Sequence, residues 1–487
     1  MSSINMVPLF LGGRTSFIAD RLGIPLHVYY LAHHWIGRMA VFEGILHTAL
    51  AFTSLDAVDR AHSLISGLAL VVALGAMSLL SLYPIRQFRF ELFLKVHLLL
   101  SFITIGLLLW HLLPGNITKL LYPIIALFLW FSNAMFRLRQ IRYNSVGART
   151  KHQQVLITKY LRSPHIPGNL SDPEVGALKL EVEFERPMNI KPGQYLYIST
   201  NDLRFRHGFQ SRPFAIVWWN DAPVGGGLVM TEQTKASGLT FLIEPRDGFT
   251  ARLTKENALN HLSLDGPYGQ DLRLESYDTV LLVAKGIGIA GMLSYAKQLI
   301  WWKSNSLQKR RVITRKLDIY WELDDNGQER WVGDYLRQLQ DKNNLLSTPL
   351  LQIWCYFPEP KRSEPFIKLQ DGVLDYQYFY PGGPTYTDIK DAVKEVTENA
   401  PGTSIVASCG VPTFTKEMRK AVLSTTNREN IIEFVEVEYR PTVPQTTTKT
   451  VDEIELSDVR PILVSKPVVH YESAGNVERQ VEVTSFV

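Results

Sequence analysis

The stretch from His33 to His47 reads HHWIGRMAVFEGILH, and a second stretch, from His97 to His111, reads HLLLSFITIGLLLWH. In each, the first and last histidines are fourteen residues apart. Fourteen residues return a helix to within about 40° of the same face and advance it by about 21 Å, which fits inside a bilayer core of about 30 Å. Two such helices side by side would offer two tiers of paired imidazoles. Two stacked haems need this arrangement of axial nitrogen ligands.

These histidines also have a plainer interpretation, in which each imidazole is simply hydrogen-bonded within a helical bundle. Strongly polar side chains at membrane depth are costly, and two pairs with identical spacing favour haem ligation. His34 does not share the spacing, so we take His33 as the ligand and His34 as a flanking residue. His27 and His62 lie near the ends of apolar segments, where an interfacial position is expected.

Long apolar stretches predict a transmembrane haem domain of four spans over residues 26–140. The run Ser63–Pro84 carries no charge, whereas Arg38 and Glu43 lie inside the first stretch. Charges at that depth must face the bundle or a cofactor. Arg38 has two candidate partners, a haem propionate and Glu43, and the sequence does not separate them. The four stretches are 26–53, 63–84, 91–113 and 119–136.

The basic residues set the expected orientation in the membrane. They gather before the first span, between the second and third, and after the fourth. The positive-inside rule then places residues 1–25 and everything after residue 137 in the cytosol, with His33 and His97 as the inner tier. The net charge of +4 gives no sign of nucleic-acid binding. The two cysteines suit a reducing compartment and not a disulfide framework.

The pattern changes to short strands and turns from about residue 150. Residues 150–272 predict a small antiparallel β-barrel, and residues 275–441 predict an α/β domain with a parallel sheet. The expected barrel strands are Val155–Thr158, Leu178–Phe184 and Tyr195–Ser199, and the expected parallel strands are Thr279–Ala284, Asp318–Glu322, Leu351–Cys355 and Ser404–Ala407.

A glycine-rich turn, Lys285-Gly286-Ile287-Gly288-Ile289-Ala290-Gly291, follows the first of these parallel strands. Such a turn suits a pyrophosphate at the amino end of a helix, although glycines also mark plain turns. Cys409 and Gly410 end the last of these strands, where small residues permit the close approach of a flat ring. A buried core thiol is the plainer interpretation of Cys409.

Taken in order, these features resemble the ferric reductase and NADPH oxidase superfamily, and most of all a fungal ferric-chelate reductase. The run His33-His34-Trp35-Ile36-Gly37-Arg38 resembles that family's His-Arg-Trp-Ile-Gly-Arg, whose first histidine is a haem ligand. Equal spacings of fourteen also resemble ferric reductases more than NADPH oxidases. The resemblance implies that the metal ligands are His33, His47, His97 and His111.

The resemblance also implies an FAD-binding β-barrel over residues 150–272 and an NADPH-binding α/β domain of ferredoxin-reductase type over residues 275–441. The run Gln210–Ile216 resembles a His-Pro-Phe-Thr motif that cradles the flavin, with arginine in place of the histidine. The implied FAD contacts are Arg212, Pro213, Phe214, Ala215, Gly248, Phe249 and Thr250, and the implied NADPH contacts are Gly266, Pro267, Tyr268, Gly269, Gly286, Gly288, Cys409 and Gly410.

The chain also departs from the family's pattern. The family builds its haem domain from about six spans, and the apolar run 4–11, within residues 1–25, resembles the end of a lost helix. Lys285 stands where the family has glycine. A lysine there would be strained at a positive φ, and at a negative φ its ammonium could help to hold phosphate. Residues 442–487 are expected to be a disordered tail.

The function implied by the resemblance is that of an integral membrane oxidoreductase of the plasma membrane with its carboxyl-terminal domains in the cytosol. Electrons would pass from cytosolic NADPH through FAD and two b-type haems to a ferric or cupric chelate outside. Two alternatives stay open: a superoxide-producing NADPH oxidase, and a truncated, non-catalytic haem-binding remnant. A homo-oligomer is compatible with the sequence, which does not decide the oligomeric state.

Overall fold

The computed structural model describes most of the chain before residue 438. The described residues are 2–10, 26–53, 61–82, 84–85, 90–113, 117–145, 155–162, 174–200, 211–222, 234–246, 249–269, 271–305, 312–360, 367–369, 372–400, 402–425 and 432–437. Residues 1–441 form one compact unit. The tail expected at 442–487 lies outside the described residues, and its disorder stays a prediction.

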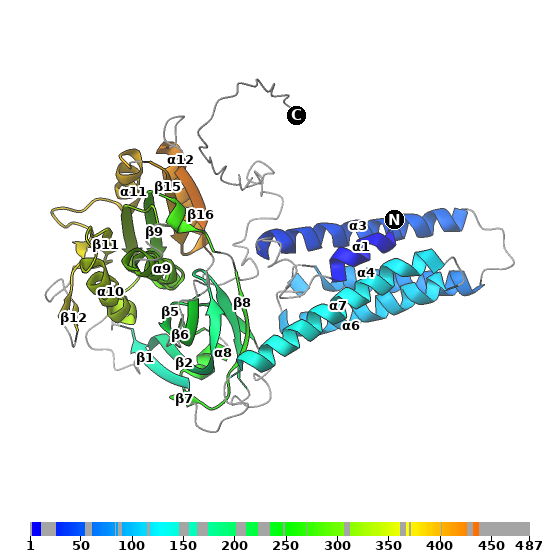
Figure 1. Cartoon of the computed structure of the whole chain (residues 1–487). Helices are drawn as coiled ribbons and strands as arrows, with labels where there is room; N and C mark the ends of the chain where they lie inside the picture. Colours follow the sequence, from blue (N-terminus) through cyan, green and yellow to red (C-terminus); the bar gives the residue numbers. More distant parts are fainter. Residues whose placement is uncertain are drawn as a thin grey trace, which may run out of the picture. The chain divides into compact units, whose positions relative to one another are not determined.

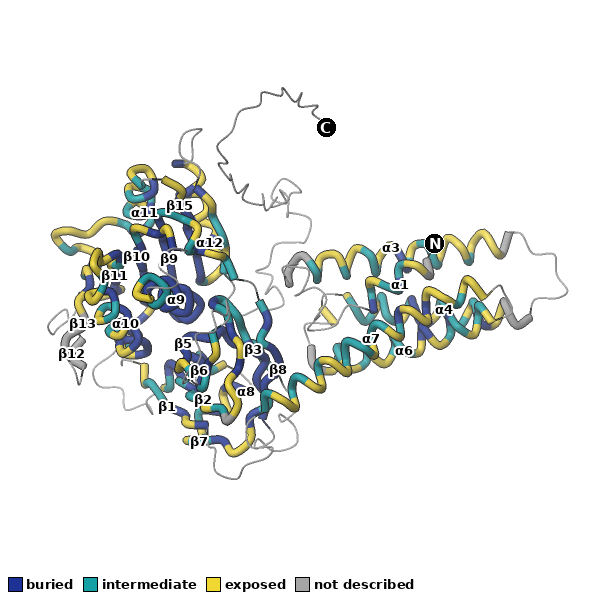
Figure 2. Tube along the Cα trace, viewed as in Figure 1, coloured by how far each residue is buried: buried dark blue, intermediate teal, exposed yellow. Residues whose placement is uncertain are grey.

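Helices make up the amino-terminal part of the chain (Figure 1). They share a thin apolar core that includes Ala40, Ile105 and Ala126. Many of their other apolar side chains face outward, such as Phe42 at 60% and Phe128 at 67% exposure (Figure 2). A broad exposed apolar surface of this kind is stable against lipid and not against water. The helices are α1 (Ser2–Phe10), α3 (Leu26–Thr53), α4 (Ala61–Leu80), α6 (Phe90–Leu112) and α7 (Ile117–Asn144).

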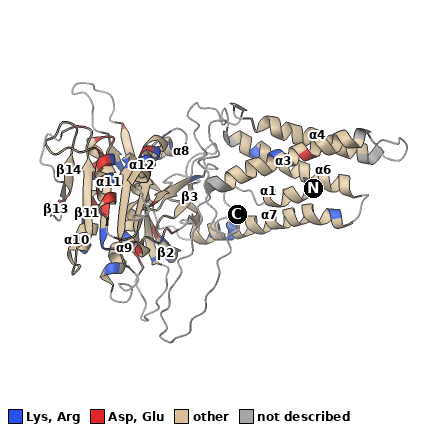
Figure 3. Ribbon diagram, turned by 90° about the horizontal axis from the view of Figure 1, so that it is seen from above, with Lys and Arg blue, Asp and Glu red and all other residues tan. Residues whose placement is uncertain are grey.

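The predicted spans correspond to the four long helices, with α7 running to Asn144 and so beyond its expected end. By length and composition alone, two helical segments are apolar enough to cross a membrane, Leu92–Leu112 and Ile117–Asn144. The apolar run of α4, Leu64–Leu80, is shorter. Figure 3 shows few charged residues along the long helices, and α3 carries both signs. Membrane crossing by α3 and α4 therefore stays a prediction.

The region expected to be a barrel forms two antiparallel sheets around one apolar core. The larger sheet has the strand order β5-β6-β2-β1-β7, and the smaller has the order β4-β3-β8. Side chains alternate along the strands, and Leu180, Ile198 and Phe241 all enter the shared core. The elements are β1 (Val155–Leu161), β2 (Val175–Ile190), β3 (Tyr195–Ser199), β4 (Arg212–Ala215), β5 (Trp218–Asp221), β6 (Thr234–Ile243), α8 (Phe249–Leu253), β7 (Ala258–Leu259) and β8 (Ser263–Tyr268).

The predicted parallel sheet is confirmed, with the strand order β14-β11-β10-β9-β15-β16. Strand β9 lies inside this sheet, with β10 on one side and β15 on the other, so it ends at the switch point where sheets of this kind bind ligands. Val280 and Leu282 of β9 pack against α9 and α10, whereas Leu281 and Val283 pack against α11 and α12.

The elements of this region follow the βα alternation that the sequence predicts. They are η1 (Leu274–Ser276), β9 (Thr279–Lys285), η2 (Gly286–Gly291), α9 (Leu293–Ser304), β10 (Lys316–Glu322), η4 (Asn326–Gln328), α10 (Glu329–Asn344), β11 (Leu351–Tyr356), β12 (Ile367–Leu369), β13 (Gly372–Leu374), β14 (Gln377–Phe379), α11 (Ile389–Glu398), β15 (Ser404–Cys409), α12 (Pro412–Thr425) and β16 (Ile432–Glu436).

Lys297 of α9 joins the parallel region to the antiparallel one. Its ammonium donates to the carbonyl of Trp219 in β5 at 2.5 Å and lies 4.3 to 5.2 Å from the ring centroids of Trp218, Trp219 and Trp301. The carboxylate of Asp221 is 3.6 Å away. Burial lowers the pKa of Lys297 to about 8, and the attraction of Asp221 opposes the shift.

We expect the free energy of unfolding to rise between pH 8 and pH 10.5, because over that range the unfolded chain keeps the Lys297 proton and the folded chain has lost it. From about pH 7.5 to about pH 9.5 the contribution is up to about 2 kcal/mol. Lys297→Met should flatten this rise. Thermal unfolding of both proteins at the two pH values checks the prediction, and an equal rise in the variant contradicts it.

Candidate functional site

The structure pairs the four histidines as the sequence predicts. His33 of α3 lies beside His97 of α6 with ring centroids 6.3 Å apart, and His47 of α3 lies beside His111 of α6 at 6.4 Å. The planes of the rings are inclined by 65° in the first pair and 80° in the second. His34 is an exposed neighbour of His33. The side chains of His27 and His62 lie outside the described residues.

The spacing within each pair fits a metal ion held between two imidazoles. Because metal–imidazole bonds are about 2 Å long and a ring nitrogen lies about 1 Å from the centroid, opposed ligands stand about 6 Å apart between centroids. In addition, the buried Nδ1 atoms of His33 and His97 have no hydrogen-bond partner within the described part of the chain. Unpaired buried polar atoms are costly. The two imidazoles of each pair therefore suit the binding of a metal-containing group, such as haem, that is not part of the polypeptide.

The pair of His47 and His111 has support from α4 that the sequence did not indicate. The Oγ atom of Ser66 lies 3.0 Å from Nδ1 of His111. A Cβ atom on the next residue, Gly67, would lie 3.2 Å from Cε1 of His111, so the glycine leaves room for the ring. A hydrogen bond to the second ring nitrogen fixes the tautomer and orientation of a metal-binding histidine. The signal in the sequence is a serine and a glycine together inside the charge-free run Ser63–Pro84.

The two charged residues of α3 have separate partners. The Arg38 guanidinium lies 5.1 Å from the ring centroid of Trp35. Glu43 accepts a hydrogen bond from the amide of Asn5 in α1 at 3.2 Å. The contact ties the short helix α1 to α3, which the sequence did not indicate.

The motif compared with a flavin cradle forms strand β4. Phe214 and Ala215 are buried, whereas Arg212 and Pro213 are half-buried. Phe249 and Thr250 begin α8, and Phe249 shares an apolar cluster with Phe214. The structure thus brings both segments to one core. Gly248 lies outside the described residues.

The glycine-rich turn and the Cys409-Gly410 segment meet at the switch point of the parallel sheet. A Cβ atom on Gly288 would lie 2.2 Å from the carbonyl oxygen of Cys409, so only glycine permits this approach. Cys409 is fully buried. The indole of Trp321 donates to the carbonyl of Gly286 at 2.9 Å, which holds the turn from the neighbouring strand β10.

The other glycine segment predicted for this site lies elsewhere. Gly266, Pro267 and Tyr268 end strand β8, in the small antiparallel sheet, and Gly269 follows it. Sheet β4-β3-β8 also carries Arg212, so the structure groups these residues with the flavin-type motif of β4 and not with the parallel strands. The predicted barrel range, residues 150–272, already included this segment, and its role in nucleotide binding stays a prediction.

The structure decides between the two expectations for Lys285. Its φ of −121° is ordinary extended backbone, so the lysine causes no strain. Its ammonium donates to Oε1 of Glu322 at 2.5 Å and lies 5.9 Å from the ring centroid of Phe414. Glu322 ends the adjacent strand β10, so this cation lies beside the glycine turn and carries a carboxylate partner.

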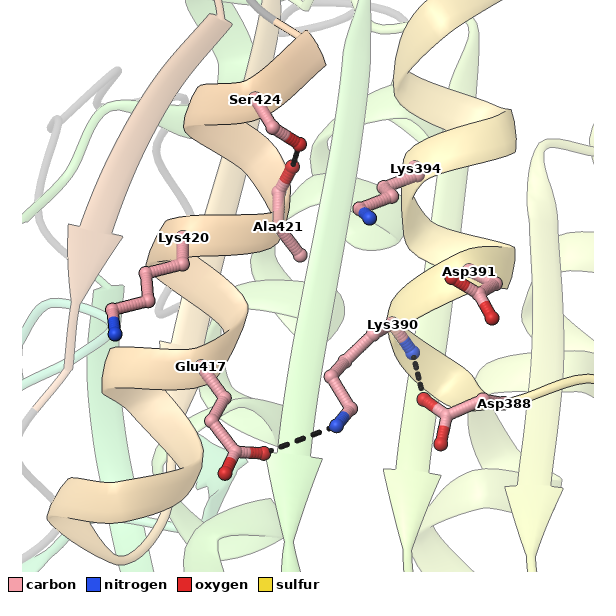
Figure 4. A pocket seen from close by; sticks show the side chains of 8 residues that line it. All are labelled: Asp388, Lys390, Asp391, Lys394, Glu417, Lys420, Ala421 and Ser424. Atoms are coloured by element: carbon pink, nitrogen blue, oxygen red, sulfur yellow. Dashed lines mark hydrogen bonds and ion pairs between the residues drawn. The ribbon is translucent and has the colours of Figure 1, made fainter.

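A shallow groove of about 470 Å³ lies between α11 and α12 (Figure 4). Lysine and acidic side chains alternate along it, and Lys390 bonds to Glu417 at 3.2 Å. None of the residues predicted to bind a cofactor lines it. It is a solvated charged surface and not the candidate site.

Comparisons with known proteins agree with this division of the chain. The model "Ferric reductase like transmembrane component" matches residues 1–108, and the model "Ferric reductase NAD binding domain" matches residues 277–368. The paired histidines lie in or just beyond the first match, and the glycine turn lies in the second. The two matches make the amino-terminal part of the chain similar to the membrane component of ferric reductases and residues 277–368 similar to their NAD-binding domain.

The chain is related to the fungal ferric reductases, as the sequence motifs indicated. Ferric reductase transmembrane component 3 of Saccharomyces cerevisiae is 26% identical over 310 residues, which are 60% of this chain and 38% of that protein. Component 6 of the same yeast is 23% identical over 449 residues, 87% of this chain and 57% of that protein. "Probable cell surface ferric reductase kap2" of Aspergillus oryzae is 23% identical over 378 residues, 73% of this chain and 46% of that protein. The chain therefore spans only part of the length of these relatives.

Proposed function

We propose that the chain is a transmembrane metalloreductase that passes electrons from cytosolic NADPH, through FAD and two b-type haems, to a ferric or cupric chelate across the membrane. The pairing of His33 with His97 and of His47 with His111 carries the proposal. The names of the relatives support the acceptor, and the match to a transmembrane component supports the location. The parallel sheet, with a glycine-rich turn at its switch point, supports the nucleotide donor.

Each part of the chain has a distinct task in this proposal. The flavin and haems, when bound, supply the redox chemistry. The four histidines would hold the two haem irons, one pair of imidazoles to each, and Ser66 would fix the ring of His111. Arg212 presents a fixed positive charge beside the flavin motif. Gly288 lets the turn after β9 pack directly against the end of β15, where the nucleotide would bind.

An anaerobic visible spectrum of membranes that contain this chain, recorded before and after NADPH, tests the proposal. Sharp b-type bands after NADPH support the coupled route, and ferric chelate against oxygen as the sole acceptor then separates a metalloreductase from an oxidase. If the bands appear only with dithionite, the proposal that the chain binds haem stands and the proposed electron route from NADPH is contradicted. Absence of bands in membranes shown to contain the protein contradicts the proposal as a whole.

Ser66→Ala is expected to raise the midpoint potential of the outer haem. The hydroxyl accepts from Nδ1–H of a metal-bound imidazole, and this bond strengthens the ligand and favours ferric iron. A tenfold change in the relative affinity for ferric and ferrous iron corresponds to about 59 mV in a one-electron couple, so we expect an upward shift of tens of millivolts. Redox titration of the haem bands measures it.

Ser78→Ala is the matched control, because Ser78 lies on the same helix and its hydroxyl donates to the backbone carbonyl of Leu74 and not to a histidine. The control should leave both haem potentials in place. Equal potentials for the wild type and Ser66→Ala would show that the hydroxyl does not act on His111.

A further inference from the structure

Three polar side chains near the end of α7 contact the segment Asp265-Gly266 in strand β8. Arg137, Gln140 and Asn144 recur at spacings of three and four, so they share one face of the helix. Nε of Arg137 lies 2.6 Å from a carboxylate oxygen of Asp265, and the amides of Gln140 and Asn144 each donate to the carbonyl of Gly266 at 2.7 Å.

The residues that accept these bonds, Asp265 and Gly266, are held by further contacts, and Asp265 is buried. Asp265 is 4% exposed, and its second carboxylate oxygen accepts from the hydroxyl of Tyr268 at 2.6 Å. A buried carboxylate needs such partners, because removing the cation would leave an uncompensated charge. Gly266 has a φ of +127°, which favours glycine, and a Cβ there would lie 2.9 Å from Leu196. The role that the resemblance implies for Gly266–Gly269, contact with NADPH, does not account for the bonds from α7.

The turn belongs to the sheet that carries the flavin-type motif. Strand β8 pairs with β3, and β3 pairs with β4, which holds Arg212–Ala215. The rings of Tyr195, Tyr197 and Tyr268 contact one another, with centroids 5.9 to 6.0 Å apart, and link β3 to the turn. At its other end, α7 is part of the apolar bundle through Ala126. One continuous helix therefore joins the histidine bundle to the small sheet.

We propose that Arg137, Gln140 and Asn144 form a latch that keeps the sheet β4-β3-β8, which carries the flavin-type motif, at a fixed distance from the inner haem tier. They are then positioning residues for electron transfer between the flavin and that haem. The inference rests on the proposed function. The step concerned would carry one electron from the reduced flavin to the ferric iron that His33 and His97 would hold, and no bond to the chain would form or break. The rate of electron transfer falls steeply as the distance between donor and acceptor grows. A loosened latch therefore slows this step and leaves hydride transfer to the flavin unaffected.

Rapid mixing of the full-length, cofactor-loaded protein with NADPH under anaerobic conditions tests the latch. Bleaching of the flavin and growth of the reduced haem bands are followed in the same trace. For Arg137→Ala we expect flavin reduction within about twofold of the wild type and haem reduction slower by about tenfold or more. Arg137→Lys, which keeps the charge, should recover part of the haem rate.

Arg142→Ala is the matched control, because Arg142 lies on the same helix end and is exposed. It should leave both rates unchanged. A wild-type haem rate in Arg137→Ala overturns the inference, and so does an equal fall in both rates, which would indicate a merely structural role. If Arg137→Ala does not fold, the double variant Gln140→Ala with Asn144→Ala removes only the neutral bonds and should still slow the haem step selectively. Failure of the wild type itself to reduce haem with NADPH would instead contradict the proposed function.

Discussion

Replacing His97 with alanine should remove about half of the haem from the protein and reduce chelate reduction by pyridine nucleotide to background, a fall of more than about 100-fold. His97 supplies one of two imidazoles in the inner tier, and its partner His33 cannot complete axial ligation alone. The inner tier is the proposed entry point for electrons, so the outer tier cannot compensate. The haem content per polypeptide and the rate of chelate reduction measure the two effects.

His34→Ala is the control for this experiment, since His34 adjoins His33 on the same helix but lies exposed. It should retain both haems and at least about half of the activity. Full haem content in His97→Ala, or loss of haem in His34→Ala, would show that the ligand assignment is wrong.

Gly288→Ala is expected to abolish reduction of the flavin by NADPH while the haems still respond to dithionite. The added Cβ would lie 2.2 Å from the carbonyl oxygen of Cys409, so either the turn or the end of β15 must move. Both border the switch point where the nucleotide is proposed to bind. We expect a fall of about 100-fold or more in the nucleotide-dependent rate.

Gly176→Ala provides the comparison, because a Cβ at that position in β2 would meet its neighbours at ordinary distances of 3.5 to 3.6 Å. Flavin content, measured in both variants, shows whether the fold of the reductase part survives. Normal reduction of the flavin by NADPH in Gly288→Ala would contradict the placement of the nucleotide at this turn.

The elements that depend on local pattern could be predicted from the sequence. The helix expected at 26–53 has those bounds, and the strand expected at Tyr195–Ser199 has its bounds too. The shared face of His33 and His47, and that of His97 and His111, followed from helical geometry, because fourteen residues return a helix to nearly the same face. The pairing of His33 with His97 followed from the expected orientation of the spans. The parallel sheet followed from apolar strands that alternate with helical stretches.

The features that depend on contacts between distant residues could not be predicted in the same way. The bond between Ser66 and His111 joins two helices whose relative rotation no periodicity reveals. The bonds from Gln140 and Asn144 to the carbonyl of Gly266 join segments that are far apart in the sequence. The choice between strain and phosphate binding at Lys285 needed its backbone angle and its partner Glu322.

The support that α4 gives to His111 would make the two ends of the proposed electron route unequal. Ser66 and Gly67 bring a third helix to the pair of His47 and His111, whereas His34 and Phe93, whose rings lie against the pair of His33 and His97, belong to α3 and α6 themselves. A disturbance that reaches α4, such as a bilayer of unsuitable thickness, would then slow electron transfer from the pair of His47 and His111 to the acceptor. Electron transfer from the flavin to the pair of His33 and His97 would continue. Failure to accept electrons and failure to hand them on would be separable faults in this protein.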